Sequence, residues 1–378
     1  MGERKRITLL YNFSEDWIGG TYYILNIIRA LNYLEDSKKP LLIILHGINS
    51  SLTEVKKINY PYLEYQPFLF KLGYLQRFVN KFFYYLNGET PFKMKIPTEL
   101  ATNIYPLIPQ ISEKSIMKGY FWIPDFQEKH MPHLFSKNEV RFRMKSHKNY
   151  LKNRADLVFS SQTAKNDFDN YYPENTNENV ILRFVSIIDK SFENIDITGL
   201  FEKYHIKMPY FIVPNQFWKH KNHEVILNAV KILSDKGVTF QMVLTGKEKD
   251  HRNPAYAIQL RDFVKENGLV DKILFLGFIP RDEQMQLMNN SLAIIQPSLF
   301  EGWSTVVEDS KVLNHFILVS DIPIHKEQIG ENCMFFNPHN ALELSDKMSN
   351  LLNKGVTTSK IDYDESILEF ATKFISLF

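Results

Sequence analysis

Short apolar runs, each followed by small or polar residues and then by a helical pattern, recur along the chain. The run RITLLY at residues 6–11 precedes Gly19 and Gly20 and then a helix-like segment. The apolar residues of that segment keep helical spacing: Ile24, Ile27, Ile28 and Leu31. The order of strand, small residues and helix is the opening of a doubly wound α/β domain with a parallel sheet.

The pattern fades near the middle of the chain and then starts again. Residues 190–208 lose the apolar periodicity, and the run YFIVP at 210–214 restarts the order of strand, loop and helix. A length of 378 residues favours two or three domains over one. We therefore predict α/β architecture with two Rossmann-like domains, residues 1–195 and 196–360, followed by a helix within residues 361–378.

Charge and composition narrow the class of protein. The 45 basic and 43 acidic residues leave a net charge of +2, which gives no support for a nucleic-acid binder. Cys333 is the single cysteine, so no intrachain disulfide forms and a reducing compartment is favoured. The opening apolar run is shorter than the core of a signal peptide, and no uncharged apolar run reaches the roughly 18 residues of a membrane span. We expect a cytoplasmic protein, with peripheral contact at the inner face of the membrane left open.

Residues suited to a ligand site follow directly after predicted strands. They are Lys219 and Lys221 after YFIVPN, Gly246 at the end of MVLTG, Glu301 after LAIIQPS, and Asp125 after GYFWIP. The carboxyl ends of parallel strands meet at one edge of a sheet, where ligands bind in such folds. These residues therefore predict a ligand cleft between the two domains.

The stretch PSLFEGWSTVVEDS at 297–310 places Glu301, Glu308 and Asp309 around a helix start. Ser304 or Thr305 is suited to cap this helix, whose free N–H groups and positive dipole end then favour phosphate. The spacing of Thr305 and Glu308 also fits a capping box, which favours a structural role for Glu308.

Three segments carry a family resemblance: residues 209–233, residues 273–314 and the stretch ILVSDIPIHKEQIG. They resemble the carboxyl-terminal half of the family-four glycosyltransferases, the group 1 glycosyl transferases, which are retaining, nucleotide-sugar-dependent enzymes of the GT-B fold. WIPDFQEKHMPHLFS resembles their amino-terminal half more weakly. The resemblance implies two Rossmann-like domains facing across a cleft, an amino-terminal acceptor domain and a carboxyl-terminal donor domain. It also implies a last helix that crosses back to the first domain. The apolar positions of that amphipathic segment predict its buried stripe: Ile367, Phe370, Phe374 and Leu377.

The resemblance also assigns roles. Glu301 matches the acid that lies against the donor sugar, and Asp309 stands where the family has the glutamate that binds the ribose. Lys221 matches the phosphate-binding lysine, but Gln216 stands at the position of the phosphate-binding arginine, so Lys219 or His220 is a candidate for the missing charge. Asp125 follows Pro124 where the family often has His-Asp, so the acceptor-side histidine has no counterpart.

The predicted site follows from these matches. The expected catalytic residues are Glu301, Lys221 and Asp125. The expected donor-binding residues are Gly19, Gly20, Gln216, Lys219, Gly246, Gly277, Ser304, Thr305, Val306 and Asp309. We expect no metal and no cofactor, because the triplets at 167–169 and 362–364 look solvated and His130 and His133 lack further ligands. Nucleic acid is not an expected partner; the expected partners are a nucleotide-sugar donor and a glycan or lipid-linked acceptor, as in polysaccharide biosynthesis.

Several alternatives stay open. The same fold also carries nucleotide-sugar epimerases and phosphorylases, and a carbohydrate-binding protein that has lost turnover is a rival outside enzymes. Gly19 and Gly20 are also compatible with a plain tight turn, and residues 219–221 with a solvated one. Residues 67–88 are aromatic and basic, with Lys71, Arg77 and Lys81; we expect them to pack on the core or an acceptor groove, with a membrane-surface helix as the alternative.

Overall fold

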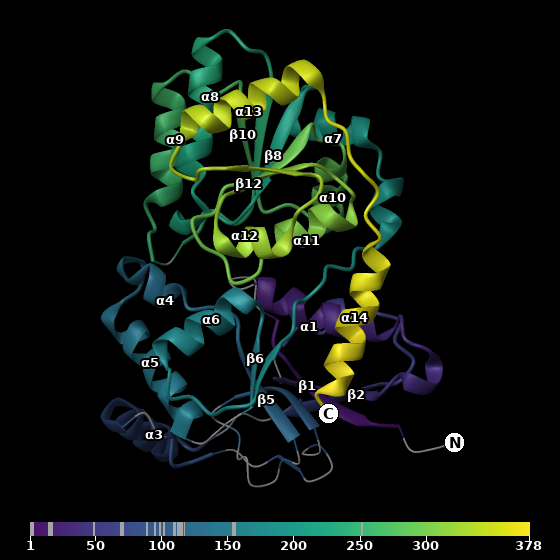
Figure 1. The fold of residues 1–378 in the computed structure, drawn as a ribbon, viewed down its shortest axis with the longest axis vertical. Helices are drawn as coiled ribbons and strands as arrows, with labels where there is room; N and C mark the ends of the chain where they lie inside the picture. Colours follow the sequence, from purple (N-terminus) through teal and green to yellow (C-terminus); the bar gives the residue numbers. More distant parts are fainter. Residues whose placement is uncertain are drawn as a thin grey trace. The chain divides into compact units, whose positions relative to one another are not determined.

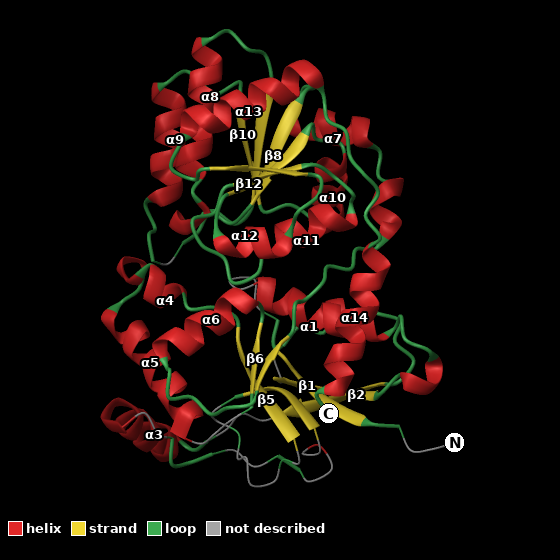
Figure 2. Cartoon of the chain, in the orientation of Figure 1, coloured by secondary structure: helices red, strands yellow, loops and turns green. Residues whose placement is uncertain are grey.

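The computed structural model describes the chain except for residues 1–3, 14–17, 48–49, 69–71, 88–89, 94–95, 98–99, 101–102, 109–110, 112–115, 117, 153–155 and 251. It divides into two compact units, Met1–Val185 with Asp364–Phe378, and Ser186–Tyr363. Each unit is built on one sheet of parallel strands, with helices in the connections (Figure 1 and Figure 2). The predicted α/β class with two parallel sheets is therefore confirmed.

The amino-terminal unit contains a seven-stranded sheet in the order β3-β2-β1-β4-β5-β6-β7. Its strands are β1 (Arg6–Tyr11), β2 (Leu41–Gly47), β3 (Leu63–Phe68), β4 (Asn103–Leu107), β5 (Lys118–Ile123), β6 (Leu157–Phe159) and β7 (Asn179–Ile181). Its helices are α1 (Ile18–Leu31), α2 (Thr53–Lys56), α3 (Tyr74–Asn87), α4 (Gln127–His130), α5 (Lys137–Lys152) and α6 (Gln162–Tyr171). The strand order reverses direction between β1 and β4, as in a doubly wound sheet.

The carboxyl-terminal unit contains a six-stranded sheet in the order β10-β9-β8-β11-β12-β13. Its strands are β8 (Tyr210–Pro214), β9 (Gln241–Thr245), β10 (Ile273–Gly277), β11 (Ala293–Gln296), β12 (Ile317–Ser320) and β13 (Cys333–Phe336). Its helices are α7 (Ile197–Tyr204), α8 (His223–Asp235), α9 (Tyr256–Glu266), α10 (Arg281–Asn289), α11 (Thr305–Val312), α12 (Pro323–Gln328) and α13 (Ala341–Lys354). Here the order reverses between β8 and β11.

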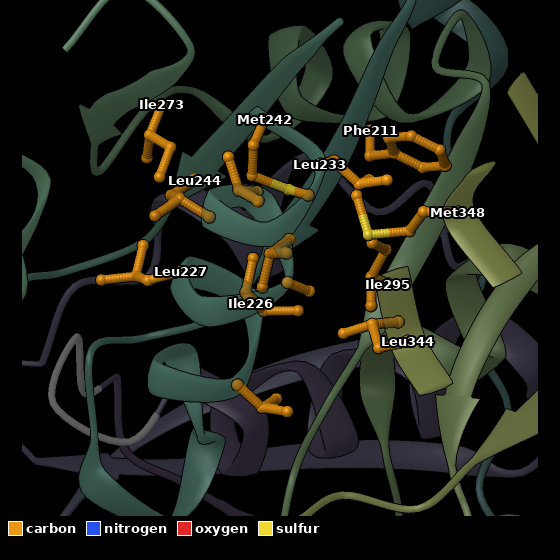
Figure 3. Close-up of a cluster of buried hydrophobic side chains, with 14 of the residues drawn as sticks. Phe211, Ile226, Leu227, Leu233, Met242, Leu244, Ile273, Ile295, Leu344 and Met348 are labelled. Carbon is orange, nitrogen blue, oxygen red and sulfur yellow. The ribbon is translucent and has the colours of Figure 1, made fainter. Parts of the chain in front are cut away.

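The core of the carboxyl-terminal unit shows why its strands are almost wholly apolar. Successive side chains of a strand point to opposite faces, so Phe211 and Val213 of β8 join one cluster and Tyr210 and Ile212 join the other. Residues of α8, α9 and α13 complete the first cluster (Figure 3). Residues of α10 and α11 complete the second. The sheet is therefore covered by helices on both faces, which matches continuous apolar strands.

The last helix, α14 (Tyr363–Ser376), packs on the amino-terminal unit. The side chains of the predicted stripe are buried: Ile367 is 3% exposed, Phe370 3%, Phe374 0% and Leu377 3%. The ring of Phe374 lies 5.4 Å from that of Tyr105 in β4, edge to face. The predicted buried stripe is confirmed, and burying one such phenylalanine stabilises the packing by roughly 1.5–3 kcal/mol.

Helix α3 departs from the sequence-based expectation. The predicted packing of residues 67–88 on the core is wrong for Tyr74 and Phe78, which are 83% and 63% exposed, whereas Phe68 of the same segment is buried in the core. Phe70 and Lys71 of this segment lie outside the described residues. Among the described residues, no helix combines the length and the apolar character needed to cross a bilayer.

Candidate functional site

The candidate site of the carboxyl-terminal unit forms where the order of its strands reverses. Strand β8 leads into a short 3-10 turn, Lys219–Lys221, and its neighbour β11 leads into the loop that carries Glu301. Because the two strands are parallel and adjacent, both connections leave the sheet at the same edge. Lys221 Nζ lies 2.6 Å from Glu301 Oε1, with side-chain exposures of 16% and 9%. The structure thus brings together two residues that are 80 positions apart in the sequence.

Glu301 is held through one oxygen. Its Oε1 atom accepts hydrogen bonds from Lys221 Nζ, from Gln296 Nε2 at 2.9 Å and from Ser298 Oγ at 2.6 Å. Among the described residues, no donor lies on Oε2. A carboxylate fixed in this way presents its second oxygen as a pre-oriented acceptor for a hydroxyl group.

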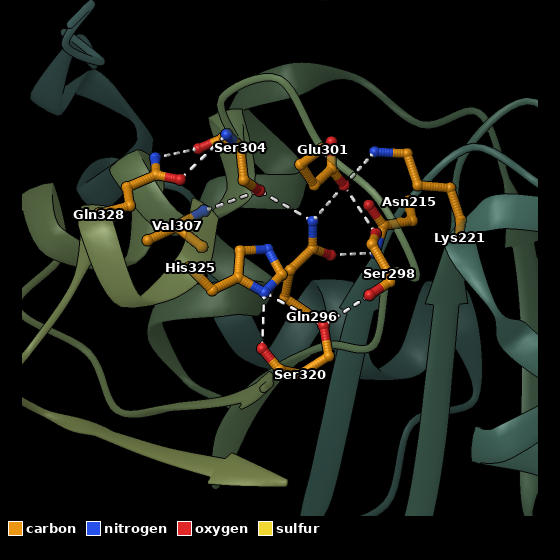
Figure 4. A network of polar contacts seen from close by, with 10 residues as sticks. All are labelled: Asn215, Lys221, Gln296, Ser298, Glu301, Ser304, Val307, Ser320, His325 and Gln328. Atoms are coloured by element: carbon orange, nitrogen blue, oxygen red, sulfur yellow. Dashed lines mark hydrogen bonds and ion pairs between the residues drawn. The ribbon is translucent and has the colours of Figure 1, made fainter. Parts of the chain in front are cut away.

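Gln296 and Asn215 are functional-site residues that the sequence analysis missed. The side-chain oxygen of Gln296 accepts from Asn215 Nδ2 at 2.5 Å, while its Nε2 donates to Glu301 and, at 2.8 Å, to Ser304 Oγ (Figure 4). Both amides are almost fully buried, with exposures of 0% for Gln296 and 3% for Asn215. The sequence held a signal for both residues, since each amide stands at the polar end of an otherwise apolar strand.

Helix α11 begins directly behind this network. Ser304 is its N-cap, and its Oγ accepts from Val307 N at 3.4 Å. Gln328 of α12 secures the cap, because its Oε1 accepts from Ser304 N at 3.0 Å and its Nε2 donates to Ser304 O at 2.7 Å. Thr305 and Val306 occupy the first turn, where backbone N–H groups have no acceptor within the helix. The helix therefore offers amide donors and the positive end of its dipole beside Glu301.

Glu308 does not take part in a capping box. Since Ser304 and not Thr305 is the cap, Glu308 lies one position beyond the box position, and the predicted pairing of Thr305 with Glu308 is wrong. The Glu308 carboxylate is 1% exposed and accepts from Gln328 Nε2 at 2.9 Å, Lys311 Nζ at 3.1 Å and the Tyr363 hydroxyl. Burial and this carboxylate raise the pKa of Tyr363 far above its usual value, so the phenol stays a donor. Glu308 is a buried structural anion.

Asp309, the predicted ribose residue, is also 1% exposed. Its Oδ1 atom accepts from Arg281 at the start of α10 and from Ser186 Oγ, both at 2.5 Å. The Arg281 side chain is 29% exposed, so solvent reaches one side of this ion pair. The contacts join α10, α11 and the chain segment that enters the unit.

Of the two glycines predicted to line the donor site, Gly246 directly follows β9 and Gly277 ends the adjacent strand β10. Gly246 N donates to Gly277 O at 2.8 Å. The φ angle of Gly246 is +134°, and a Cβ atom built on it would lie 2.3 Å from the backbone oxygen of Asn215. Only glycine fits there, because any side chain would collide with the backbone that leads to Lys221.

The positive charges near Lys221 are distributed differently from the expectation. Lys219 forms an ion pair with Glu224, and His220 is 4% exposed. Burial, followed by the nearby charges of Lys221 and Arg252, lowers the pKa of His220 well below its usual value, so this imidazole is neutral near pH 7. Arg252 lies with its guanidinium carbon 4.9 Å from the ring centre of Trp218 in the β8 loop. Arg252, whose Nε lies 3.4 Å from Asp250 Oδ1, is therefore a further cation beside this loop, and the sequence analysis missed it.

Gln216 belongs to the same loop. It is half-buried, and its carbonyl oxygen accepts from Trp218 N at 2.8 Å. The Cβ that Gly246 lacks would also lie 2.8 Å from Gln216 N. Gln216 thus lies at the crowded turn where β8 ends, and its phosphate contact stays a prediction.

The predicted residues of the amino-terminal unit lie in two places. Asp125 follows β5, and its Oδ1 accepts from Gln127 N at 3.0 Å and lies 3.5 Å from Arg143. Burial raises the pKa of the neighbouring Glu128, which Arg143 also contacts, at 3.2 Å. Gly19 and Gly20 lie inside the first turn of α1, where Gly20 is buried. In the part of the chain that the structure describes, no group of three or more His, Cys, Asp or Glu side chains is arranged to hold a metal.

Residues 198–366 match the family model described as glycosyl transferases group 1. This region covers most of the carboxyl-terminal unit and less than half of the chain. Over the whole chain, the fold resembles solved GT-B structures. A glycosyltransferase from Rickettsia africae has a TM-score of 0.63 at 16% identity, and the match covers 100% of this chain and 95% of that one. Anabaena HepE in complex with UDP and glucose has a TM-score of 0.64 at 12% identity, covering 99% and 94%.

Curated relatives match over shorter regions. The O-antigen chain mannosyltransferase RfbU of Salmonella typhimurium is 27% identical over 160 residues, 42% of each chain. The serotype-specific mannosyltransferase WbdA of Escherichia coli is 25% identical over 207 residues, 53% of this chain and 25% of WbdA. The aligned regions thus span less than half the length of these relatives. Residues 198–366 of this chain therefore resemble group 1 glycosyl transferases, and the fold of the chain resembles GT-B structures.

Proposed function

We propose that the protein is a glycosyltransferase that moves a hexose from a nucleotide-sugar donor to a glycan or lipid-linked acceptor, with retention of configuration. The observation that carries this proposal is the contact between Lys221 and Glu301 at the carboxyl ends of β8 and β11. The group 1 match and the GT-B fold support the class of reaction. Mannose is the first sugar to test, because RfbU and WbdA are named mannosyltransferases.

The pair supplies the two functions that such a transfer needs. Glu301 orients sugar hydroxyl groups through the oxygen that faces away from its three protein donors. Lys221 Nζ has three N–H donors and uses one of them on Glu301, so it retains donors for a diphosphate. The first turn of α11 adds backbone N–H groups, and these partners stabilise the negative charge of the leaving nucleoside diphosphate.

A single lysine already paired with a carboxylate is a weak match for a diphosphate of about two negative charges. We assign the second cation to Arg252 rather than to His220, which is neutral. Both Arg252 and Lys219 are themselves paired with carboxylates, Asp250 and Glu224. In this assignment Gln216 provides a neutral contact where a charged one was expected. Asp125 is assigned to the acceptor side, as a hydrogen-bond acceptor at the end of β5.

The test is transfer by the purified protein with a panel of nucleotide sugars, preceded by a screen for thermal stabilisation by each donor. Lys221→Ala should slow transfer by about 30-fold or more, since it removes at least about 2 kcal/mol of transition-state stabilisation. Activity should survive EDTA, because side chains and a helix terminus supply the positive charge. Loss of activity with EDTA and its recovery with manganese would contradict the metal-independent mechanism.

Donor binding without turnover would instead support a carbohydrate-binding protein that keeps the site. A turnover of donor into an isomer without transfer would support an epimerase. An Asp235→Asn variant is a matched control, because this surface carboxylate is 65% exposed and pairs with Lys231, away from the proposed contacts. Its kinetics should equal those of the parent protein.

A further inference from the structure

Helix α3 turns an apolar stripe toward solvent. The stripe begins with the adjacent Tyr74 (83% exposed) and Leu75 (76%) and continues at steps of three or four positions with Phe78 (63%), Phe82 (58%) and Leu86 (67%). Residues at this spacing share one face of a helix. An exposed apolar face of this length marks an interaction site on the surface of a protein.

The opposite face of α3 is polar and faces the protein. Asn80 is 8% exposed, and its side chain donates to Phe92 O at 2.7 Å and accepts from Phe92 N at 2.9 Å. One turn later, the Tyr84 hydroxyl donates to Phe142 O of α5 at 2.8 Å. The usual amphipathy of a surface helix is therefore reversed: hydrogen bonds anchor the polar face, and this anchoring holds the apolar stripe outward.

Helix α3 and the neighbouring helix α5 carry more basic than acidic residues. Helix α3 contains Arg77 and Lys81, both exposed, and no acidic residue. Helix α5 packs beside it through Tyr84 and Phe142, whose rings lie 4.7 Å apart, and Phe142 itself is 50% exposed. The exposed bases of α5 are Lys137, Arg141, Lys148 and Lys152, against one acidic residue, Glu139.

We propose that this surface, the exposed stripe of α3 with its flanking bases, binds an anionic lipid bilayer. The helix would lie in the plane of the interface, with its aromatic rings among the acyl chains and its bases at the anionic headgroups. Exposed aromatic and leucine side chains without any acid on the same helix complement an anionic, apolar layer. The inference does not depend on the proposed transferase activity, because lipid binding is measured without a donor sugar.

The experiment is co-sedimentation of the full chain with vesicles of phosphatidylcholine alone and of phosphatidylcholine mixed with phosphatidylglycerol. We expect binding to the anionic vesicles, weakening as salt is raised, and little binding to the neutral ones. Phe78→Ser with Phe82→Ser should reduce binding by about tenfold or more, because two buried rings are lost. Arg77→Gln with Lys81→Gln should reduce it by about fivefold per base.

A matched control replaces apolar side chains of similar exposure in the other unit, Ile258→Ser with Val270→Ser, which are 61% and 60% exposed. This control should bind vesicles as the parent protein does. Circular dichroism and a melting curve establish that each variant is folded. Absence of binding to anionic vesicles by the folded parent protein overturns the proposal. The proposal is also overturned if the parent protein does not bind vesicles but forms a dimer that the Phe78 and Phe82 variant does not form. That result would assign the stripe to contact with a second copy of the chain.

Discussion

Replacing Glu301 by glutamine tests the site by changing one carboxylate oxygen into an NH₂ group. In the parent protein three donors, from Lys221, Gln296 and Ser298, converge on Oε1. The new amide must keep its oxygen on this side, because an NH₂ group there would face three donors. Its NH₂ group then replaces Oε2, so the ligand-facing atom changes from an acceptor to a donor.

The magnitude follows from that exchange. A hydrogen bond from a sugar hydroxyl to a carboxylate contributes roughly 1.5–3 kcal/mol, so transfer should slow by about 10- to 150-fold. We expect the loss mainly in kcat, because orientation of the sugar matters most at the transition state. The three donors keep an acceptor, so the fold should survive the change.

The assay is release of nucleoside diphosphate under saturating and limiting donor, beside a thermal melt. Ser298→Ala is the informative companion, because it removes one support of Oε1 and leaves the ligand-facing oxygen unchanged. Ser298→Ala should raise the activation free energy of transfer by a smaller amount, about 1 kcal/mol. A Glu301→Gln enzyme that is folded and turns over like its parent would refute the assigned role, as would a Ser298→Ala defect of equal size.

Three further predictions concern stability. Gly246→Ala should lower the free energy of unfolding, measured in urea, by about 3 kcal/mol, because its Cβ would lie 2.3 Å from the Asn215 oxygen at a φ of +134°. An unchanged midpoint of the urea unfolding curve would contradict the close approach. Asp309→Asn should lower Tm, because it removes the anion that Arg281 binds in a site 1% exposed; a change limited to the donor KM would instead support a ribose contact. Burial lowers the pKa of His325 from 6.5 to about 4, so the unfolded chain takes up the proton first as pH falls. The free energy of unfolding should therefore decline by about 3 kcal/mol between pH 6.5 and 4, and His325→Gln should remove that part of the slope.

The sequence was sufficient for the parts of the protein that depend on local periodicity. Apolar runs of strand length alternating with helical patterns predicted two parallel sheets, and the spacing of Ile367 and Phe374 predicted the buried face of the last helix. Helix-start chemistry also identified Ser304 as a cap candidate. Such signals are readable because strand and helix periods are properties of neighbouring residues.

Tertiary structure decided which of the polar residues contact one another. Glu308 and Asp309 are adjacent in the sequence, but one is bound by Gln328 and Lys311 and the other by Arg281 and Ser186. Lys311 follows Glu308 by three positions on the same helix, but the other partners come from other elements, so no local pattern indicates them.

The same holds for α3 and for the support of Glu301. The composition of the α3 segment led us to expect packing on the core or an acceptor groove, but the buried hydrogen bonds of Asn80 to Phe92 turn the apolar stripe outward. Gln296 and Asn215 gained their role from the pairing of β8 with β11, which joins residues 81 positions apart. A one-dimensional pattern can specify which face of an element is apolar, but the partner of a polar side chain depends on the packing of distant segments.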